Sequence, residues 1–165
     1  MKRFLWIALV ASLTLEPLCS SADPAPVFVR TLDTSSLAFI TGLGADVEGN
    51  LYVGDAFNDR VVKFNSIGQI IGTHGSTGDE PGKFNFPSDI VVSPAGEIFV
   101  ADSHNHRVQV FDGQFNYLRE WSTGANATGF MATDASGQLI FVNAGGGMSV
   151  HHPEGDLVAN WPCMF

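Results

Sequence analysis

The sequence predicts an all-β fold, a partial β-propeller of about three four-stranded antiparallel blades. The first observation is an internal repeat. Asp55-Ala-Phe-Asn-Asp-Arg-Val-Val-Lys-Phe64 recurs, 47 residues further on, as Asp102-Ser-His-Asn-His-Arg-Val-Gln-Val-Phe111. A period in the forties with several short strands per unit is typical of a propeller. The second observation is a pattern of short, alternating apolar and polar runs broken by Gly, Asn, Asp and Pro, which favours strands.

The first 22 residues have the organisation of a secretory signal peptide. Lys2 and Arg3 precede an apolar run of 12 residues from Phe4 to Leu15, and Ser20-Ser-Ala22 supplies the small residues that a signal peptidase recognises. The apolar run is too short to span a membrane. We therefore predict a secreted, extracellular protein that has no membrane association once the signal is cleaved.

A bacterial lipoprotein signal is the alternative at this end of the chain. It requires small residues just before the modified cysteine, but Leu18 stands before Cys19. Cleavage after Ala22 removes Cys19, so Cys163 remains alone and the mature chain has no internal disulfide. Cys163 could then pair between molecules or mark a truncated end of the chain.

Residues 75–121 form the clearest unit, which we interpret as the second blade. Turns at Pro94-Ala-Gly96 and Asp112-Gly113 separate its apolar runs. The four predicted strands are Pro87–Ser93, Glu97–Ala101, Arg107–Phe111 and Phe115–Trp121. Four antiparallel strands in about 40 residues make one propeller blade.

The units on either side follow the same template less closely. Residues 39–74 are the first blade, with strands predicted near Phe39–Ala45, Asn50–Gly54, Arg60–Asn65 and Gln69–His74. Residues 122–165 are a degenerate third blade, with strands predicted at Gly129–Thr133, Gln138–Val142, Met148–His151 and Asp156–Trp161. Residues 23–38 are predicted to be a linker that contains a stray N-terminal strand near Val27–Leu32.

Three blades make about half of a typical propeller ring. Each blade in a ring buries both faces of its sheet, so an open arc leaves two terminal faces uncovered. We therefore expect one of three outcomes. The chain self-associates to complete a ring, it is a fragment of a longer protein without independent function, or it is only marginally stable.

The charge balance limits the partners. The chain has 17 acidic and 8 basic residues and a net charge of −9, and the predicted signal peptide holds two of the bases and one of the acids. Such a chain is repelled by nucleic acids and by anionic membranes. We therefore predict no nucleic-acid partner. A basic protein partner is compatible with this charge.

Two stretches of the second blade carry a resemblance to a known family. They are Gly75-Ser-Thr-Gly-Asp-Glu-Pro-Gly-Lys-Phe-Asn-Phe-Pro-Ser-Asp-Ile-Val-Val92 and Gly96-Glu-Ile-Phe-Val-Ala-Asp-Ser-His-Asn-His-Arg-Val-Gln-Val-Phe111. Together they resemble an NHL repeat. The resemblance is strong over residues 72–121, good over 39–74 and weak over 129–161. It implies a six-bladed β-propeller in the full-length case, of which this chain holds about half.

The resemblance also implies two kinds of function. Most family members bind proteins, RNA or other ligands on a propeller face, which favours a protein- or ligand-binding scaffold that is incomplete as it stands. A minority, the peptidyl-hydroxyglycine amidating lyases, are secreted metal-dependent enzymes with histidine ligands around the central channel. In this sequence Ser88 or neighbouring residues other than histidine stand where such a strand would supply a histidine, so no ligand position of the lyases carries over. A fragment of such an enzyme is therefore the alternative, and a protein without enzymatic activity is preferred.

The repeated corner residues are predicted to be structural. Asp and Asn form turns by hydrogen-bonding nearby backbone, and Arg can bridge to the Asp or to neighbouring carbonyls. Recurrence at the same spacing follows blade geometry, whereas a catalytic Asp would be expected once. The residues concerned are Asp55, Asn58, Arg60, Asp102, Asn105 and Arg107.

The remaining motifs support only weak predictions. His104 and His106 follow Asp102 at alternate positions, which would suit a metal on a strand, but this stretch is a corner. His151 and His152 are adjacent and point in opposite directions if extended. We predict no metal site and no cofactor. Asn126-Ala-Thr128 is a glycosylation sequon in a loop between blades.

Overall fold

Three four-stranded antiparallel sheets make up the fold, within a compact unit that spans residues 31–165. The computed structural model describes residues 32, 34–124, 128–138, 140–144 and 147–161. The predicted signal peptide, Asn126 and Cys163 lie outside the described residues. The all-β prediction and the three-sheet architecture are confirmed, and the described part of the chain contains no helix that has the length and apolarity of a membrane span.

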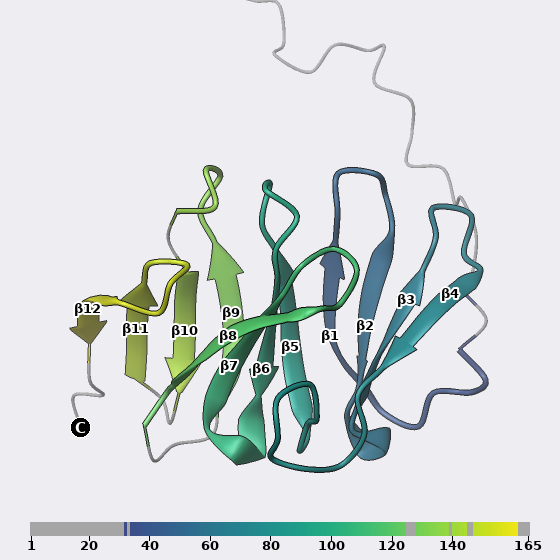
Figure 1. The fold of residues 1–165 in the computed structure, drawn as a ribbon, viewed down its shortest axis with the longest axis horizontal. Coiled ribbons are helices and arrows are strands. Elements are labelled where there is room, and N and C mark those ends of the chain that lie inside the picture. Colours follow the sequence, from purple (N-terminus) through teal and green to yellow (C-terminus); the bar gives the residue numbers. More distant parts are fainter. Residues whose placement is uncertain (1–31, 33, 125–127, 139, 145–146, 162–165) are drawn as a thin grey trace, which may run out of the picture. The chain divides into compact units, whose positions relative to one another are not determined.

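Each sheet is a meander in which strands adjacent in the sequence pair with each other (Figure 1). The first consists of β1 (Ile40–Ala45), β2 (Leu51–Asp55), β3 (Arg60–Phe64) and β4 (Ile70–His74). The second consists of β5 (Pro87–Val92), β6 (Ile98–Asp102), β7 (Arg107–Phe111) and β8 (Tyr117–Ser122). The third consists of β9 (Thr128–Thr133), β10 (Ile140–Ala144), β11 (Gly147–His151) and β12 (Leu157–Trp161).

The strands have two distinct ends. In the first two sheets a short 3₁₀ turn joins the second strand to the third, namely η1 (Ala56–Asn58) and η2 (Ser103–Asn105). We call this the corner end, at the bottom of Figure 1. The loops β1–β2, β3–β4, β5–β6 and β7–β8 lie at the opposite, turn end.

The first strands of the three sheets lie next to one another, because β1 packs against β5 and β5 against β9 (Figure 1). Two apolar layers fill the spaces between successive sheets. The first joins Tyr52 and Val61 to residues of the second sheet that include Ile90, Ile98 and Val100. The second consists of Phe99, Ala101, Val108, Val110, Trp121, Met131, Ile140 and Val142. The alternation of strand side chains thus supplies one layer from each face of the middle sheet.

Two predicted strand starts are displaced by turn chemistry. The fourth strand of the second blade begins at Tyr117 and not at Phe115, because Asp112 accepts the N–H groups of Gln114 and Asn116 and holds Phe115 in a left-handed turn (φ 64°). In the third sheet the Gln138 N–H is likewise bound, at 2.8 Å, by the Asp134 carboxylate, and β10 begins at Ile140. Asp side chains of this kind mimic a backbone turn.

Candidate functional site

Asp102 lies at the centre of a buried hydrogen-bond network at the corner end of the second sheet. Its side chain is fully buried and accepts the Asn85 N–H at 2.7 Å, the Arg107 Nε–H at 2.7 Å and the Asn105 Nδ2 at 2.9 Å. A fourth donor, the Gln109 amide, lies 3.0 Å away. Both carboxylate oxygens therefore accept hydrogen bonds inside the protein, Oδ1 from Asn85 and Oδ2 from the other three donors.

Arg107 extends this network to the loop that leads from the first sheet to the second. Its guanidinium donates to the carbonyl oxygens of Asp79 at 2.7 Å, Lys83 at 3.0 Å and Glu80 at 3.2 Å, and to the Glu120 carboxylate at 2.9 Å. These hydrogen bonds therefore connect the inter-sheet loop to the middle sheet.

The first sheet has a smaller version of the same corner. Asp55 accepts from Arg60 Nε at 2.8 Å, from Asn58 and from the N–H groups of Ala38 and Phe39, while Arg60 also reaches a backbone carbonyl. Burial opposes ionisation of Asp55, but these hydrogen bonds outweigh it and lower the pKa of the carboxyl. In the third sheet Asn143 occupies the corner position and donates instead to the Gly147 carbonyl at 3.2 Å.

Four aromatic side chains form two stacked pairs that touch each other next to these corners, and we call them the corner-end ladder: Phe39, Phe57, Phe86 and His104. Phe39 and Phe57 are stacked with ring centroids 4.6 Å apart, and Phe86 and His104 are stacked at 4.8 Å. Phe86 lies 6.2 Å from both Phe39 and Phe57, so the two pairs are continuous across the first two sheets. Phe57 is 67% exposed, and Phe39 and His104 are also exposed.

The ladder arises from the repeat. Phe39 and Phe86 are 47 residues apart, as are Phe57 and His104. In both sheets the first residue of the 3₁₀ turn donates its N–H to the carbonyl of the ladder phenylalanine, Ala56 to Phe39 and Ser103 to Phe86. Phe86 has a left-handed backbone (φ 60°), and its N–H is bound by Asp59 at 2.8 Å. The sequence interpretation missed this site, although aligning the two repeats would have revealed the paired aromatic positions.

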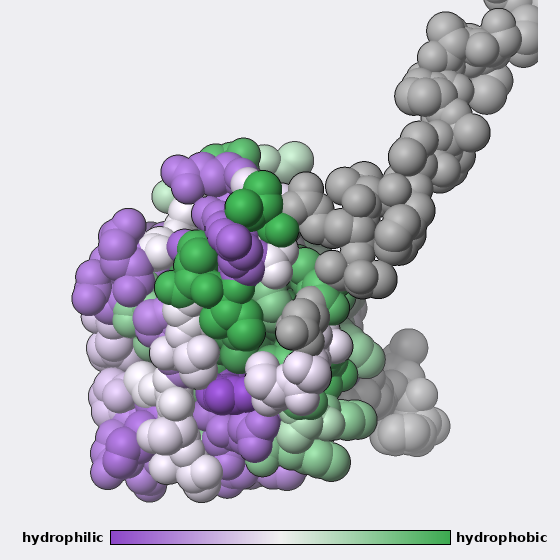
Figure 2. Space-filling view, turned by 90° about the vertical axis from the view of Figure 1, so that its right-hand side faces the viewer, coloured by the Kyte–Doolittle hydropathy of each residue, from purple (hydrophilic) through white to green (hydrophobic). Residues whose placement is uncertain are grey.

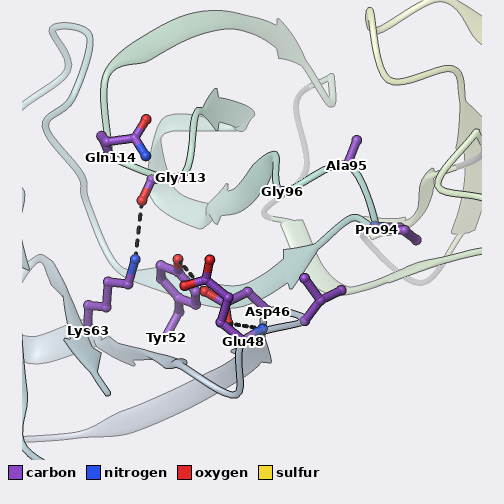
Figure 3. A pocket seen from close by; sticks show the side chains of 10 residues that line it. Asp46, Glu48, Tyr52, Lys63, Pro94, Ala95, Gly96, Gly113 and Gln114 are labelled. Atoms are coloured by element: carbon purple, nitrogen blue, oxygen red, sulfur yellow. Dashed lines mark hydrogen bonds between the residues drawn. The ribbon is translucent and has the colours of Figure 1, made fainter. Parts of the chain in front are cut away.

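A pocket of about 260 Å³ lies at the turn end between the first two sheets (Figure 3). Its walls come from the β1–β2 turn at residues 46–48, the β5–β6 turn at residues 94–96 and the β7–β8 turn at residues 113–114. Lys63 donates to the Gly113 carbonyl at 3.2 Å and lies 4.8 Å from the centre of the Tyr52 ring, whose hydroxyl donates to Asp46 at 3.1 Å. Among the described arginines and lysines, only Lys63 makes no ion pair with a carboxylate.

The inner strands are linked by side-chain hydroxyls. Thr41 of β1 donates to the Pro87 carbonyl at 2.6 Å, and Ser88 of β5, 47 residues later, donates to the Thr128 carbonyl at 2.7 Å. Asp89 accepts the Met131 N–H at 2.7 Å, and its burial raises the pKa of the carboxyl despite that hydrogen bond. Ser88, which lies in the stretch where the resemblance to the lyases would place a histidine, thus joins the second sheet to the third.

The histidines do not converge. His104 belongs to the corner-end ladder, and Asp102 beneath it is occupied by its four donors. His151 is buried against Trp121 and bonded to Ser149 and Gly155, whereas His152 is exposed. Among the described residues, no three His, Cys, Asp or Glu side chains are grouped so that they could hold a metal ion.

The comparison with known families agrees with the second sheet. Residues 84–111 match the model described as NHL repeat. The chain contains an NHL repeat. This NHL repeat spans β5 to β7 and includes Asp102, Asn105 and Arg107 of the corner network, together with Phe86 and His104 of the ladder.

A human relative supports this assignment. NHL repeat-containing protein 3 from Homo sapiens is 39% identical over 90 residues, which are 54% of this chain and 22% of that protein. The chain therefore spans less than a quarter of the length of this relative.

Two solved structures share the fold of the sheets. The WD40 repeats of RRP9 match with a TM-score of 0.65 at 12% identity, over 74% of this chain and 38% of that one. Hydrazine synthase of Kuenenia stuttgartiensis matches with a TM-score of 0.59 at 21% identity, over 74% of this chain and 36% of that one. At these identities the likeness is one of fold alone, and it places the three sheets among β-propellers.

Proposed function

We propose that the chain is a secreted NHL-repeat propeller module that binds a protein partner through the corner-end ladder. The observation that carries this proposal is a cluster of two stacked aromatic pairs, three of whose four rings are exposed and whose positions repeat with the blades. Exposed aromatic rings supply large contact area at low cost in side-chain entropy and are enriched at the energetic centres of protein interfaces. No described catalytic group competes with this use of the corner end.

Panning a displayed random-peptide library on the folded chain tests the ladder. We expect selected peptides to bind Phe57→Ala at least about tenfold more weakly, a loss of about 1.4 kcal/mol or more. Ile67→Ala, an equally apolar and exposed side chain in the β3–β4 turn, is the matched control and should leave binding unchanged. Peptides that lose affinity for Ile67→Ala and not for Phe57→Ala would place the binding face elsewhere.

Secretion is tested separately. Expression of the whole chain in a eukaryotic secretory host should release a protein whose N-terminal sequence begins at Asp23. A shift in mobility after glycosidase treatment, lost in Asn126→Gln, would show use of the sequon. Retention inside the cell with Met1 still present would contradict the signal peptide.

A small ligand in the turn-end pocket is the second candidate, and the ammonium of Lys63, which makes no ion pair with a described carboxylate, favours it. At about 260 Å³ the pocket is slightly smaller than most ligand sites, and a cation, two carboxylates and the Tyr52 ring lie on its walls. Fragment screening by NMR should then give hits whose shifts map to residues 94–96 and 113–114 and vanish in Lys63→Met. Hits that survive this substitution would remove the reason for choosing the pocket.

The enzyme alternative requires a metal. A fragment of an amidating lyase should be stabilised by zinc or calcium, because metal that binds only the folded state raises its stability. We expect no change in the thermal midpoint on adding either ion or a chelator. A rise of several degrees would favour the enzyme.

A further inference from the structure

The more exposed ring of each stacked pair in the corner-end ladder comes from the 3₁₀ turn of its sheet. Phe57 of η1 is stacked on Phe39, and His104 of η2 is stacked on Phe86. Stacking holds the Phe57 ring in place, yet the residue stays 67% exposed. Because the face of an aromatic ring carries partial negative charge, the open side of this ring attracts a cation.

A carboxylate lies beside the first of these pairs. Asp59 follows Phe57 by two residues, and it accepts the Phe86 N–H at 2.8 Å and the Thr77 hydroxyl at 2.7 Å. These bonds fix the carboxylate next to the ladder and use only two of its roughly four acceptor sites. Asp59 is half-buried and makes no ion pair with a described lysine or arginine. Its counterpart in the second repeat is His106, so the acid accompanies the first pair.

The corner end of the first two sheets has an excess of negative charge over residues 55–60, 75–86 and 102–107. The three basic side chains of these stretches are all paired with carboxylates, namely Arg60 with Asp55, Lys83 with Glu80, and Arg107 with Asp102 and Glu120. Asp59 and Asp79 remain without a described cation. Figure 2, in which the corner end is the lower edge, shows hydrophilic residues there beside hydrophobic ones. Such a surface attracts a basic partner and repels an acidic one.

We propose that the ladder docks a basic segment of its partner, with an arginine or lysine side chain on the exposed Phe57 ring and within reach of the Asp59 carboxylate. This contact rests on the protein-binding function proposed above and gives the partner its chemistry. An arginine suits the site best, since a guanidinium stacks on an aromatic face and donates to a carboxylate with the same planar group. An apolar segment would leave the Asp59 charge desolvated and unpaired, and an acidic segment would add a like charge.

Titration of the folded chain with three matched octapeptides tests the proposal. In each peptide glycine alternates with one other residue, which is arginine, glutamine or glutamate. We expect the arginine peptide to bind most tightly and the glutamate peptide least, and we expect the NMR shifts caused by the arginine peptide to map to residues 57–59 and 104. Equal affinity for the arginine and glutamine peptides, or tighter binding of the glutamate peptide, would overturn the basic partner.

Substitutions separate the local site from general attraction by charge. Asp59→Asn keeps an acceptor for the Phe86 N–H and removes only the charge, so the arginine peptide should bind about threefold more weakly or worse. Phe57→Leu keeps an apolar side chain without the ring and should weaken binding by about as much. This exposed position also keeps the test decisive if Asp59→Asn melts early, which circular dichroism checks.

Asp112→Asn is the matched control, because it removes the same charge from a turn at the opposite end of the sheets. It should leave the affinity for the arginine peptide nearly unchanged. A loss equal to that of Asp59→Asn would mean that net charge alone attracts the peptide, and the local site would be wrong.

The peptides selected from the random library distinguish this contact from the proposed function. Selection should enrich arginine and lysine, and the selected peptides should lose affinity for both Phe57→Ala and Asp59→Asn. Peptides that lack basic residues and respond only to Phe57→Ala would leave the ladder as the binding face and overturn the basic partner. Peptides that respond to neither substitution would overturn both.

Discussion

Asp102 is surrounded by four donors and has no access to solvent. Asp102→Ala would break the buried ion pair with Arg107, leaving Glu120 as its remaining carboxylate, and would remove an acceptor from Asn105 and Gln109; breaking a buried pair typically costs about 3–5 kcal/mol. We expect urea denaturation to show a destabilisation of this size. Asp112→Ala is the control, because Asp112 accepts hydrogen bonds only from Gln114 and Asn116 of its own exposed turn, so its loss should cost clearly less. Equal effects of the two changes would remove the special role of the corner.

Folding should shift the pKa values of two aspartates in opposite directions from the ordinary value of 3.8. The pKa of Asp55 is lowered, so its stabilising contribution is present above 3.8 and is lost as the pH falls through the folded value. Burial raises the pKa of Asp89. Its contribution to the stability of the fold is therefore present below pH 3.8 and is lost as the pH rises through the pKa that Asp89 has in the folded protein. Carboxyl chemical shifts followed by NMR against pH measure both. A pKa of Asp89 lower than that of Asp55 would contradict this account of their surroundings.

Sequence reasoning located the corner residues because they recur at a fixed spacing. It did not find their partners, because the carbonyl oxygens of Asp79, Glu80 and Lys83 have no signature in a sequence. The corner-end ladder could not be predicted from the sequence for a different reason. Phe39 and Phe86 precede strands whose apolar patterning explains a phenylalanine without further cause, and only the fold brings Phe57 and His104 beside them.

At the scale of elements, the arginines of the two corners differ in how many hydrogen-bond acceptors they bind. Arg107 has a side chain 9% exposed and binds two carboxylates and three carbonyls, whereas Arg60 is 26% exposed and binds one of each. Arg107→Ala should therefore destabilise the fold by about 3–5 kcal/mol and Arg60→Ala by less than half of that. Chemical denaturation of the two variants in parallel decides it. A larger loss for Arg60→Ala would mean that the first corner carries the loop.

The inner strands approach each other too closely for a side chain at Gly42. A Cβ there would lie 2.4 Å from the Asp89 Cα, so Gly42→Ala must push β1 away from β5. Overpacking of this kind costs about 1–3 kcal/mol or more. Gly113→Ala is the control, since nothing lies closer than 3.8 Å to its added Cβ. Thermal melts that shift equally for both variants would show that the strands can separate freely.

Strand number and order were predictable from alternation and repeat spacing, and the displaced starts of β8 and β10 were not. In both cases an Asp side chain captures backbone N–H groups that alternation alone assigns to a strand. Turn capture depends on the rotamer of one side chain, which a pattern of apolar positions does not specify.

At the scale of the whole molecule, the middle sheet should be the most stable part. It is covered on both faces and has the fuller corner network, whereas the third sheet has no Asp–Arg pair among its described residues. In repeat proteins stability follows such neighbour contacts. Hydrogen exchange under native conditions should therefore be slowest in β6 and β7 and faster throughout β9–β12. Uniform protection across all three sheets would contradict this order.

The hydroxyl links between inner strands carry a cost for any change of chemistry at these positions. Thr41 and Ser88 each donate a hydrogen bond to a backbone carbonyl of the next sheet. These positions, which face the neighbouring first strands, therefore already connect the sheets. A substitution of either residue by a metal-binding histidine would add a ligand and, in the same step, remove a hydrogen bond between two sheets. Metal binding and contact between the sheets would then require the same side chain. A chain of this kind could acquire a catalytic centre there only if other contacts between the sheets became stronger.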